Sequence, residues 1–128
     1  MSLSNEKSID FNKMEVECAQ LNIGPSSTVT QITSRATGVT INATSGRITT
    51  TAISIAAGAE ESFVVTNDKV SATSVPVVAM ASGSTTDTSR VLVSTVVDGS
   101  FTITLTNLNA ATADTGAAVI NFVIINGV

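Results

Sequence analysis

The sequence predicts an all-β protein, an antiparallel sandwich of about eight strands preceded by an extended N-terminal arm. Three observations support this fold class. Thr, Val and Ile, whose branched side chains suit a pleated sheet, make up 47 of the 128 residues. Leu, the usual filler of helical cores, occurs at only five positions. Short segments rich in apolar residues recur along the chain, and turn-like residues separate them.

Charge divides the chain into a leading segment and a body. Residues 1–27 hold six of the charged side chains and the other 101 residues hold ten, so we interpret 1–27 as an arm with a linker and 28–128 as the sandwich domain. Residues 14–18 alternate as a strand does. A helical stripe with spacings of three and four is also present, at Phe11, Met14, Cys18 and Leu21. Both interpretations stay open, and we favour an extended arm with one strand.

Eight segments of the body are expected to be strands. They span residues 28–34, 38–42, 46–51, 61–67, 75–81, 90–97, 100–107 and 117–126. The first three carry isolated Val or Ile residues among polar ones, and the next two carry longer apolar runs around Phe63 and Val77. The sixth and seventh flank Asp98–Gly99, a strong hairpin signal, and the eighth is apolar on both faces. Eight strands with short loops is the count of a jelly roll.

The last two strands carry specific expectations. The segment 100–107 has one apolar face and one Thr face, so Thr102, Thr104 and Thr106 should face solvent or a polar neighbour. The segment 117–126 either lies in the centre of a sheet or presents its outer face to another subunit. We favour the central position.

The composition argues against most enzymes. The chain has no His, the commonest general base near neutral pH, and no Trp or Tyr. One Cys and loops without a calcium-ligand pattern predict no metal site, and we interpret Asp87 and Asp114 as solvated loop residues. We therefore expect no catalytic residue, no cofactor and no small-molecule substrate.

Charge and hydropathy also limit the partners. Six basic against ten acidic residues give a formal net charge of -4, which argues against a nucleic-acid partner. No run of 18 apolar residues is present, so we expect no membrane partner. The N-terminus lacks the apolar core of a signal peptide, and we expect synthesis in the host cytoplasm with Cys18 reduced.

Part of the body resembles a family of virion proteins. The segments that carry the resemblance are 31–43, 46–50, 55–59 with the following Ser62-Phe63, and the ending 119–127. They are similar to the jelly-roll head decoration (cement) proteins of tailed phages, over about residues 28–127. The resemblance implies a homotrimer on the outer capsid surface of the virion, at threefold or quasi-threefold positions, with the major capsid protein as partner. The resemblance lies in the general residue pattern of these segments, and it includes no catalytic or ligand-binding motif.

Two sets of residues are candidates for contacts in such an assembly. The apolar residues of the arm are capsid-contact candidates, namely Ile9, Phe11, Met14 and Val16. Arginines at strand ends are inter-subunit candidates, because guanidinium forms bidentate pairs with carboxylates, and these are Arg35, Arg47 and Arg90. Surface pairs within one subunit are the default alternative for these arginines.

Three alternatives to a decoration protein remain at this point. Similar Thr/Ala/Val-rich modules occur in phage tail fibres, spikes and baseplates, where a trimer would serve host attachment. A carbohydrate-binding or adhesin sandwich of a secreted bacterial protein is another alternative. An enzyme such as a polysaccharide hydrolase has the least support, since the sequence offers no convincing pair of acids.

Overall fold

The chain folds into two β-sheets that pack face to face. The structure, a computed structural model, describes residues 19–20, 23–52, 54–83, 85 and 88–126. Its strands are β1 (Ser26–Thr30), β2 (Val39–Thr40), β3 (Ser45–Thr49), β4 (Glu60–Thr66), β5 (Val75–Ser82), β6 (Ser89–Val97), β7 (Ser100–Asn107) and β8 (Val119–Ile125). The described residues contain no helix. The prediction of an all-β sandwich is confirmed.

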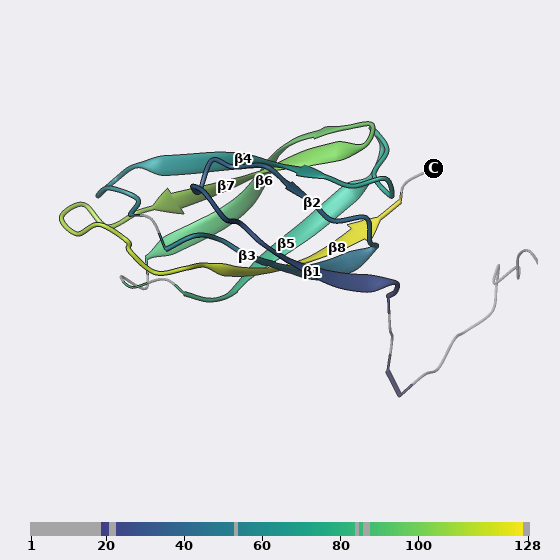
Figure 1. Cartoon of the computed structure of the whole chain (residues 1–128), viewed down its shortest axis with the longest axis horizontal. Coiled ribbons are helices and arrows are strands. Elements are labelled where there is room, and N and C mark those ends of the chain that lie inside the picture. Colours follow the sequence, from purple (N-terminus) through teal and green to yellow (C-terminus); the bar gives the residue numbers. More distant parts are fainter. Residues whose placement is uncertain (1–18, 21–22, 53, 84, 86–87, 127–128) are drawn as a thin grey trace, which may run out of the picture.

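Each sheet contains four strands. Sheet A has the order β1-β3-β8-β5 and forms the lower layer in Figure 1, and sheet B has the order β2-β4-β7-β6 and forms the upper layer. The pairs β1–β3 and β2–β4 are parallel, and the other described pairs are antiparallel. The sandwich is thus mostly antiparallel, with two parallel pairs that the sequence did not predict, and jelly-roll connectivity is not confirmed. The physical reason is that β1 to β4 alternate between the sheets, so each returns to its own sheet in the same direction.

Strand positions agree closely with the sequence patterns. Strand β7 has the predicted bounds, and Val97 pairs with Ser100 across Asp98–Gly99, as expected for a two-residue hairpin. Gly99 has a φ of 79°, a conformation that favours glycine. Strand β1 differs, since it spans Ser26–Thr30 whereas the expected segment spans residues 28–34.

The chain leaves sheet A after β1 because Gln31 ties the following loop together. The Gln31 side-chain amide is buried and donates to the carbonyl oxygens of Arg35, at 3.1 Å, and Thr37, at 2.7 Å. These bonds turn the chain and end the strand at Thr30.

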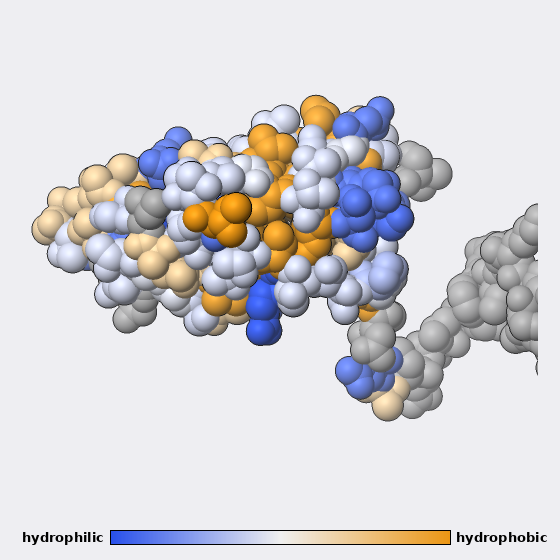
Figure 2. Space-filling view, in the orientation of Figure 1, coloured by the Kyte–Doolittle hydropathy of each residue, from blue (hydrophilic) through white to orange (hydrophobic). Residues whose placement is uncertain are grey.

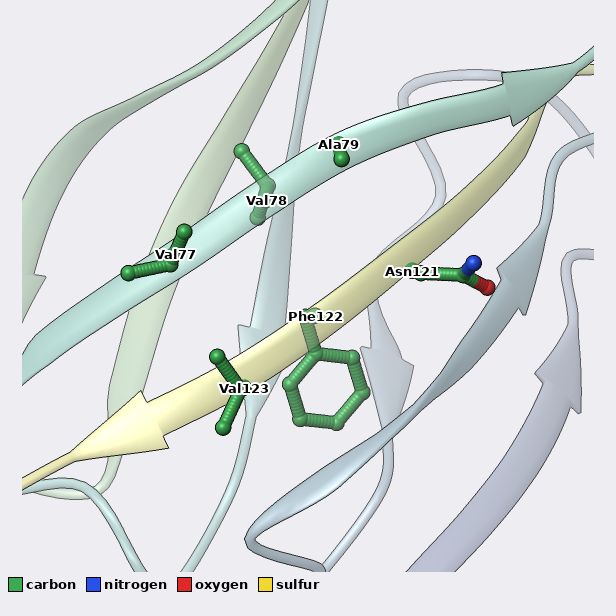
Figure 3. A pocket seen from close by; sticks show the side chains of 6 residues that line it. All are labelled: Val77, Val78, Ala79, Asn121, Phe122 and Val123. Atoms are coloured by element: carbon green, nitrogen blue, oxygen red, sulfur yellow. The ribbon is translucent and has the colours of Figure 1, made fainter. Parts of the chain in front are cut away.

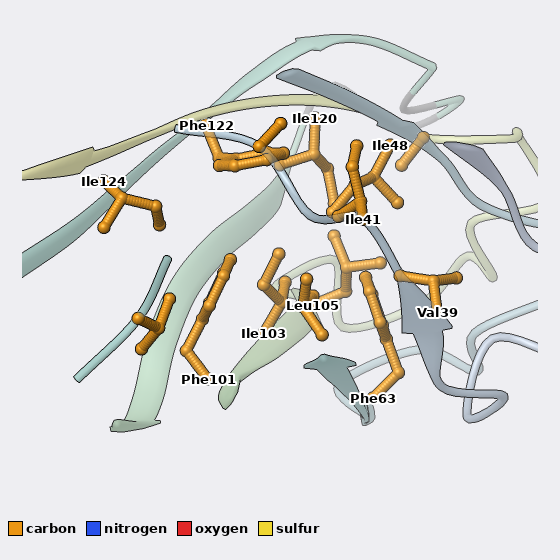
Figure 4. Packing of buried hydrophobic residues seen from close by; sticks show 14 of the residues in the cluster. Val39, Ile41, Ile48, Phe63, Phe101, Ile103, Leu105, Ile120, Phe122 and Ile124 are labelled. Atoms are coloured by element: carbon orange, nitrogen blue, oxygen red, sulfur yellow. The ribbon is translucent and has the colours of Figure 1, made fainter. Parts of the chain in front are cut away.

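The core lies between the sheets and follows from the alternation within each strand. Phe63, Phe101 and Phe122 are buried, and the rings of Phe101 and Phe122 meet across the sandwich with centroids 5.9 Å apart (Figure 4). Aliphatic residues fill the space around them, including Ile48, Val65, Ile103, Leu105, Ile120 and Ile124 (Figure 4). Burial of these apolar side chains is the main force that holds the two layers together.

The two specific strand expectations are confirmed. Thr104 is buried on the outer face of β7, and its hydroxyl meets those of Ser62, at 2.8 Å, and Ser94, at 3.1 Å. Strand β8 lies between β3 and β5, which is the central position. On its outer face, Asn121 and Ile125 nevertheless stay exposed.

Candidate interaction surface

The outer face of sheet A carries a group of apolar side chains, of which Val123 is partly buried and the others are exposed. We call this group the β5–β8 face, and its members are Val75, Val77, Ala79, Val123 and Ile125. The register places Val75 opposite Ile125 and Val77 opposite Val123, so the side chains form one contiguous surface. Val75 is 55% exposed, Val77 46% and Ile125 51%. Contiguous exposed apolar residues are typical of a surface that binds a partner.

A shallow groove runs between the two strands at the middle of this face. It has a volume of about 250 Å³ and is lined by Val77, Val78, Ala79, Asn121, Phe122 and Val123. Figure 3 shows Val77 and Val78 on β5 and Phe122 and Val123 on the neighbouring β8. The lining contains no charged side chain. Its chemistry fits a small apolar side chain of a partner.

The outer face of sheet B differs in composition. Hydroxyl groups dominate it, including the Ser62–Thr104–Ser94 contacts that cross three strands. Its exposed apolar residues, Val64, Leu92 and Val97, come from β4 and β6, with β7 between these strands. On the side of the molecule that Figure 2 shows, hydrophobic residues are visible along the middle, where the two layers of Figure 1 meet. The β5–β8 face is therefore the more continuous apolar surface of the two outer faces.

The three arginine candidates lie in different surroundings. Arg47 is exposed on the outer face of β3, where its Nε donates to the Asn121 side chain at 3.2 Å. Arg90 is exposed on β6 and donates to the carbonyl oxygen of Ser89 at 3.0 Å. Arg35 is 2% exposed and donates to the carbonyl oxygen of Gly116 within its own chain. The inter-subunit role thus stays a prediction for Arg47 and Arg90, whereas the Arg35 guanidinium is engaged inside the subunit.

Arg35 belongs to a buried polar group that joins three loops. We call it the Asp114 cluster, and it comprises Arg35, Thr85, Ser89, Asp114 and Gly116. One carboxylate oxygen of Asp114 accepts hydrogen bonds from the Thr85 backbone and hydroxyl, both at 3.0 Å, and from the Gly116 backbone at 3.1 Å. The other accepts a hydrogen bond from the Ser89 hydroxyl. These bonds hold the loops at one end of the sandwich together.

The cluster shifts the pKa of both charged groups. Burial raises the pKa of Asp114, but the hydrogen bonds from Ser89, Thr85 and Gly116 outweigh it and lower the pKa to about 2. Burial lowers the pKa of Arg35, while the negative charges of Asp114 and Glu61 act in the opposite direction. The carboxylate is therefore ionised at neutral pH, with every described contact provided by a donor that stabilises its charge.

The interpretation of Asp114 as a solvated loop residue is wrong. Its side chain is 2% exposed, because the loops before β6 and before β8 fold over it. The adjacent backbone also pairs with Ile55, which anchors a third segment. The hydroxyl donors come from the Ser- and Thr-rich segment before and at the start of β6, a composition that is equally compatible with a solvated loop. Asp87 lies outside the described residues.

The arm candidates are not placed by the structure. Ile9, Phe11, Met14 and Val16 lie outside the described residues, as does Cys18. The sequence contains a signal for the β5–β8 face, since the fifth segment is a mostly apolar run and the eighth is apolar on both faces. It did not show that the two strands are neighbours, which only the strand order reveals.

Comparison of the chain with models of protein families, with curated proteins and with solved structures gives no match. In the part of the chain that the structure describes, no helix is long and apolar enough to cross a membrane. Within the described ranges, no three or more Asp, Glu, His or Cys side chains form a group that could hold a metal ion.

Proposed function

We propose that this protein is a structural component of a phage virion that binds the outer surface of the capsid as a trimer and stabilises the shell. The observation that carries the proposal is the β5–β8 face, on which apolar side chains of two neighbouring strands are exposed side by side. Such a surface supports association with other protein subunits. The sequence resemblance to decoration proteins supports a capsid as the assembly.

The stabilising effect would follow from mass action. A protein that binds the assembled shell and not its separated subunits lowers the free energy of the shell by its binding free energy. A trimer engages three sites at once, which raises the effective concentration of each binding segment. Of the four candidates in the arm, Ile9 and Phe11 are the proposed capsid contacts on this account.

Sedimentation with undecorated capsids tests this proposal. The purified chain should sediment with the capsids and raise the temperature at which they release their contents. The variant Ile9→Ser/Phe11→Ser should bind more weakly, and Asn5→Ser/Asn12→Ser, which changes polar residues of the same segment, should bind as the unchanged chain does. Failure of the unchanged chain to sediment would contradict the capsid role, and labelling on virions would then test a position on the tail.

A further inference from the structure

We infer that Met14, Val16 and Cys18 of one copy cover the β5–β8 face of a neighbouring copy. The inference rests on the self-association contained in the proposed function and names the two surfaces that produce it. The β5–β8 face needs an occupant because its valines and isoleucine lie in contact with water at a cost in free energy. A second copy of the chain supplies one from its N-terminal segment.

The segment before β1 leaves the sandwich close to this face. The carbonyl oxygen of Ile23 accepts a hydrogen bond from the Ser45 hydroxyl at 2.5 Å, which attaches the segment to the start of β3. Ser45 pairs with Val123, and Val123 pairs with Val77. Two steps between neighbouring strands, about 10 Å, thus separate Ser45 from the valine at the centre of the face.

The course of the chain favours a neighbouring copy over the chain's own face. In Figure 1 the described residues before β1 lead away from the lower layer, and Ala19 and Gln20 are exposed. Residues 1–23 contain no Gly or Pro, the residues that most often reverse the direction of a chain. Nine extended residues from Ile23 to Met14 span up to about 30 Å, enough to reach an adjacent sandwich.

The pattern of the segment matches the pattern of the face. Met14, Val16 and Cys18 alternate with Glu15 and Glu17, so an extended chain places the three apolar side chains on one side. Val75, Val77 and Ala79 repeat on β5 with the same period of two. The groove between β5 and β8 offers a place for one of the apolar side chains. Ile9 and Phe11 fall on the opposite side of an extended segment and stay available for the capsid.

Charge also fits this pairing. Residues 1–18 contain four acidic residues and two lysines. Among the described residues on the outer face of sheet A, Arg47 is the one charged side chain. Its partner Asn121 lies opposite Ala79, one row from Val77 and Val123. Because Glu15 and Glu17 point away when Met14, Val16 and Cys18 cover the face, the segment brings no carboxylate onto the apolar side chains, and no negative charge on the face repels it.

Such an exchange explains how a closed assembly would form. Each copy donates one segment and offers one face, so the contact is heterologous and runs in one direction around the assembly. Three copies close the ring when the third segment reaches the first face. This is the trimer that the proposed function requires.

Molar mass in solution tests the face, using the full chain. The unchanged protein should have three times the 13.0 kDa mass of one chain. Val77→Asp should give the mass of a single chain, and Leu92→Asp, at a residue of sheet B that is 47% exposed against 46% for Val77, should keep the trimer mass. A monomeric unchanged protein, or a Val77→Asp variant that stays trimeric, would overturn the inference.

Cross-linking from Cys18, the only cysteine, tests the segment without any substitution. A photoreactive group is attached to Cys18 of unlabelled protein. This protein is then mixed with ¹⁵N-labelled protein, and both are unfolded and refolded together so that the copies in one assembly come from both pools. Cross-links from unlabelled Cys18 to ¹⁵N-labelled peptides of β5 or β8 are expected. Three results would each overturn the inference: cross-links only within one chain, cross-links only to sheet B, or no cross-link to any residue of the sandwich.

The two experiments separate this inference from the proposed function. A chain that binds capsids as a trimer but shows no cross-link to β5 or β8 of a neighbour contradicts the exchange alone. A chain that exchanges its segments but does not sediment with capsids contradicts the capsid role alone.

Discussion

The Asp114 cluster and the β5–β8 face reverse the usual positions of polar and apolar side chains, in opposite ways. In the cluster, a carboxylate and a guanidinium are almost fully buried. On the face, the side chains of Val75, Val77 and Ile125 are about half exposed. Both arrangements cost free energy, because charges favour water and hydrocarbon avoids it.

The difference lies in how each cost is offset. Within the cluster, four hydrogen bonds to the Asp114 carboxylate offset its desolvation inside the same chain. On the β5–β8 face, nothing in the described part of the chain covers the exposed residues. A buried polar group with all its partners therefore indicates a role in stability, whereas an exposed apolar group without partners indicates a role in association.

Removal of the Asp114 carboxylate should have the largest effect on stability. Asp114→Ala removes a negative charge that favours the buried Arg35 guanidinium and leaves the Ser89 and Thr85 hydroxyls without their acceptor. The free energy of unfolding should fall by about 3–5 kcal/mol, the usual range for breaking a buried charged network. Unfolding in urea measures it. Asp68→Ala is the control, since the exposed pair of Asp68 with Lys69 at 3.1 Å should contribute less than about 1 kcal/mol. Equal losses in the two variants would contradict the role of the cluster.

Acid should remove the same contribution without a substitution. The pKa of Asp114 is lowered from 3.8 to about 2, so its stabilisation is fully present above pH 3.8 and is lost as the pH falls through 2. The loss should amount to about 2 kcal/mol. The test is to measure the free energy of unfolding at several pH values between 5 and 2. Asp114→Asn, which lacks the titrating carboxylate, is the control variant. An equally steep acid loss in Asp114→Asn would assign the effect to other carboxylates.

Local patterns in the sequence were enough to predict most of the fold. Phe101, Ile103 and Leu105 alternate with threonine, and this period of two fixed both the strand and its buried face. The Asp98–Gly99 turn fixed the neighbour of that strand. The parallel pairs β1–β3 and β2–β4 could not be predicted, because alternation shows which face is buried but not which strand lies beside it.

The candidate sites depended on contacts between distant parts of the sequence, and these were the least predictable. Asp114 receives its donors from Thr85 and Ser89, which lie 29 and 25 residues earlier. In the sequence, the same Ser- and Thr-rich loops are compatible with full solvation. The β5–β8 face likewise requires β5 and β8 to be neighbours, although about 40 residues separate them in the chain.

A smaller effect is expected for the buried hydroxyl on sheet B. Thr104→Val keeps the shape of the side chain but removes its hydrogen bonds with Ser62 and Ser94. Ser62 and Ser94 are exposed and can bond to water instead, so the loss should be about 1 kcal/mol or less in urea unfolding. Thr102→Val, on the same face of β7, is the matched control and should change the stability less. A loss for Thr104→Val as large as that for Asp114→Ala would remove the contrast between charged and neutral buried groups.

The smallest effect on folding is expected on the β5–β8 face. Val77→Ser changes a side chain that is already 46% exposed, so the unfolding free energy of the monomer should change by about 0.5 kcal/mol or less. The effect on association should be larger. A contact that forms only in the assembly stabilises the folded chain by an amount that grows with the logarithm of the protein concentration. Melting temperatures of the unchanged chain should therefore rise with protein concentration, and those of Val77→Ser should rise less. A concentration series that gives two parallel lines would mean that Val77 contributes nothing to association, and the exposed face would then lack the role that distinguishes it from the Asp114 cluster.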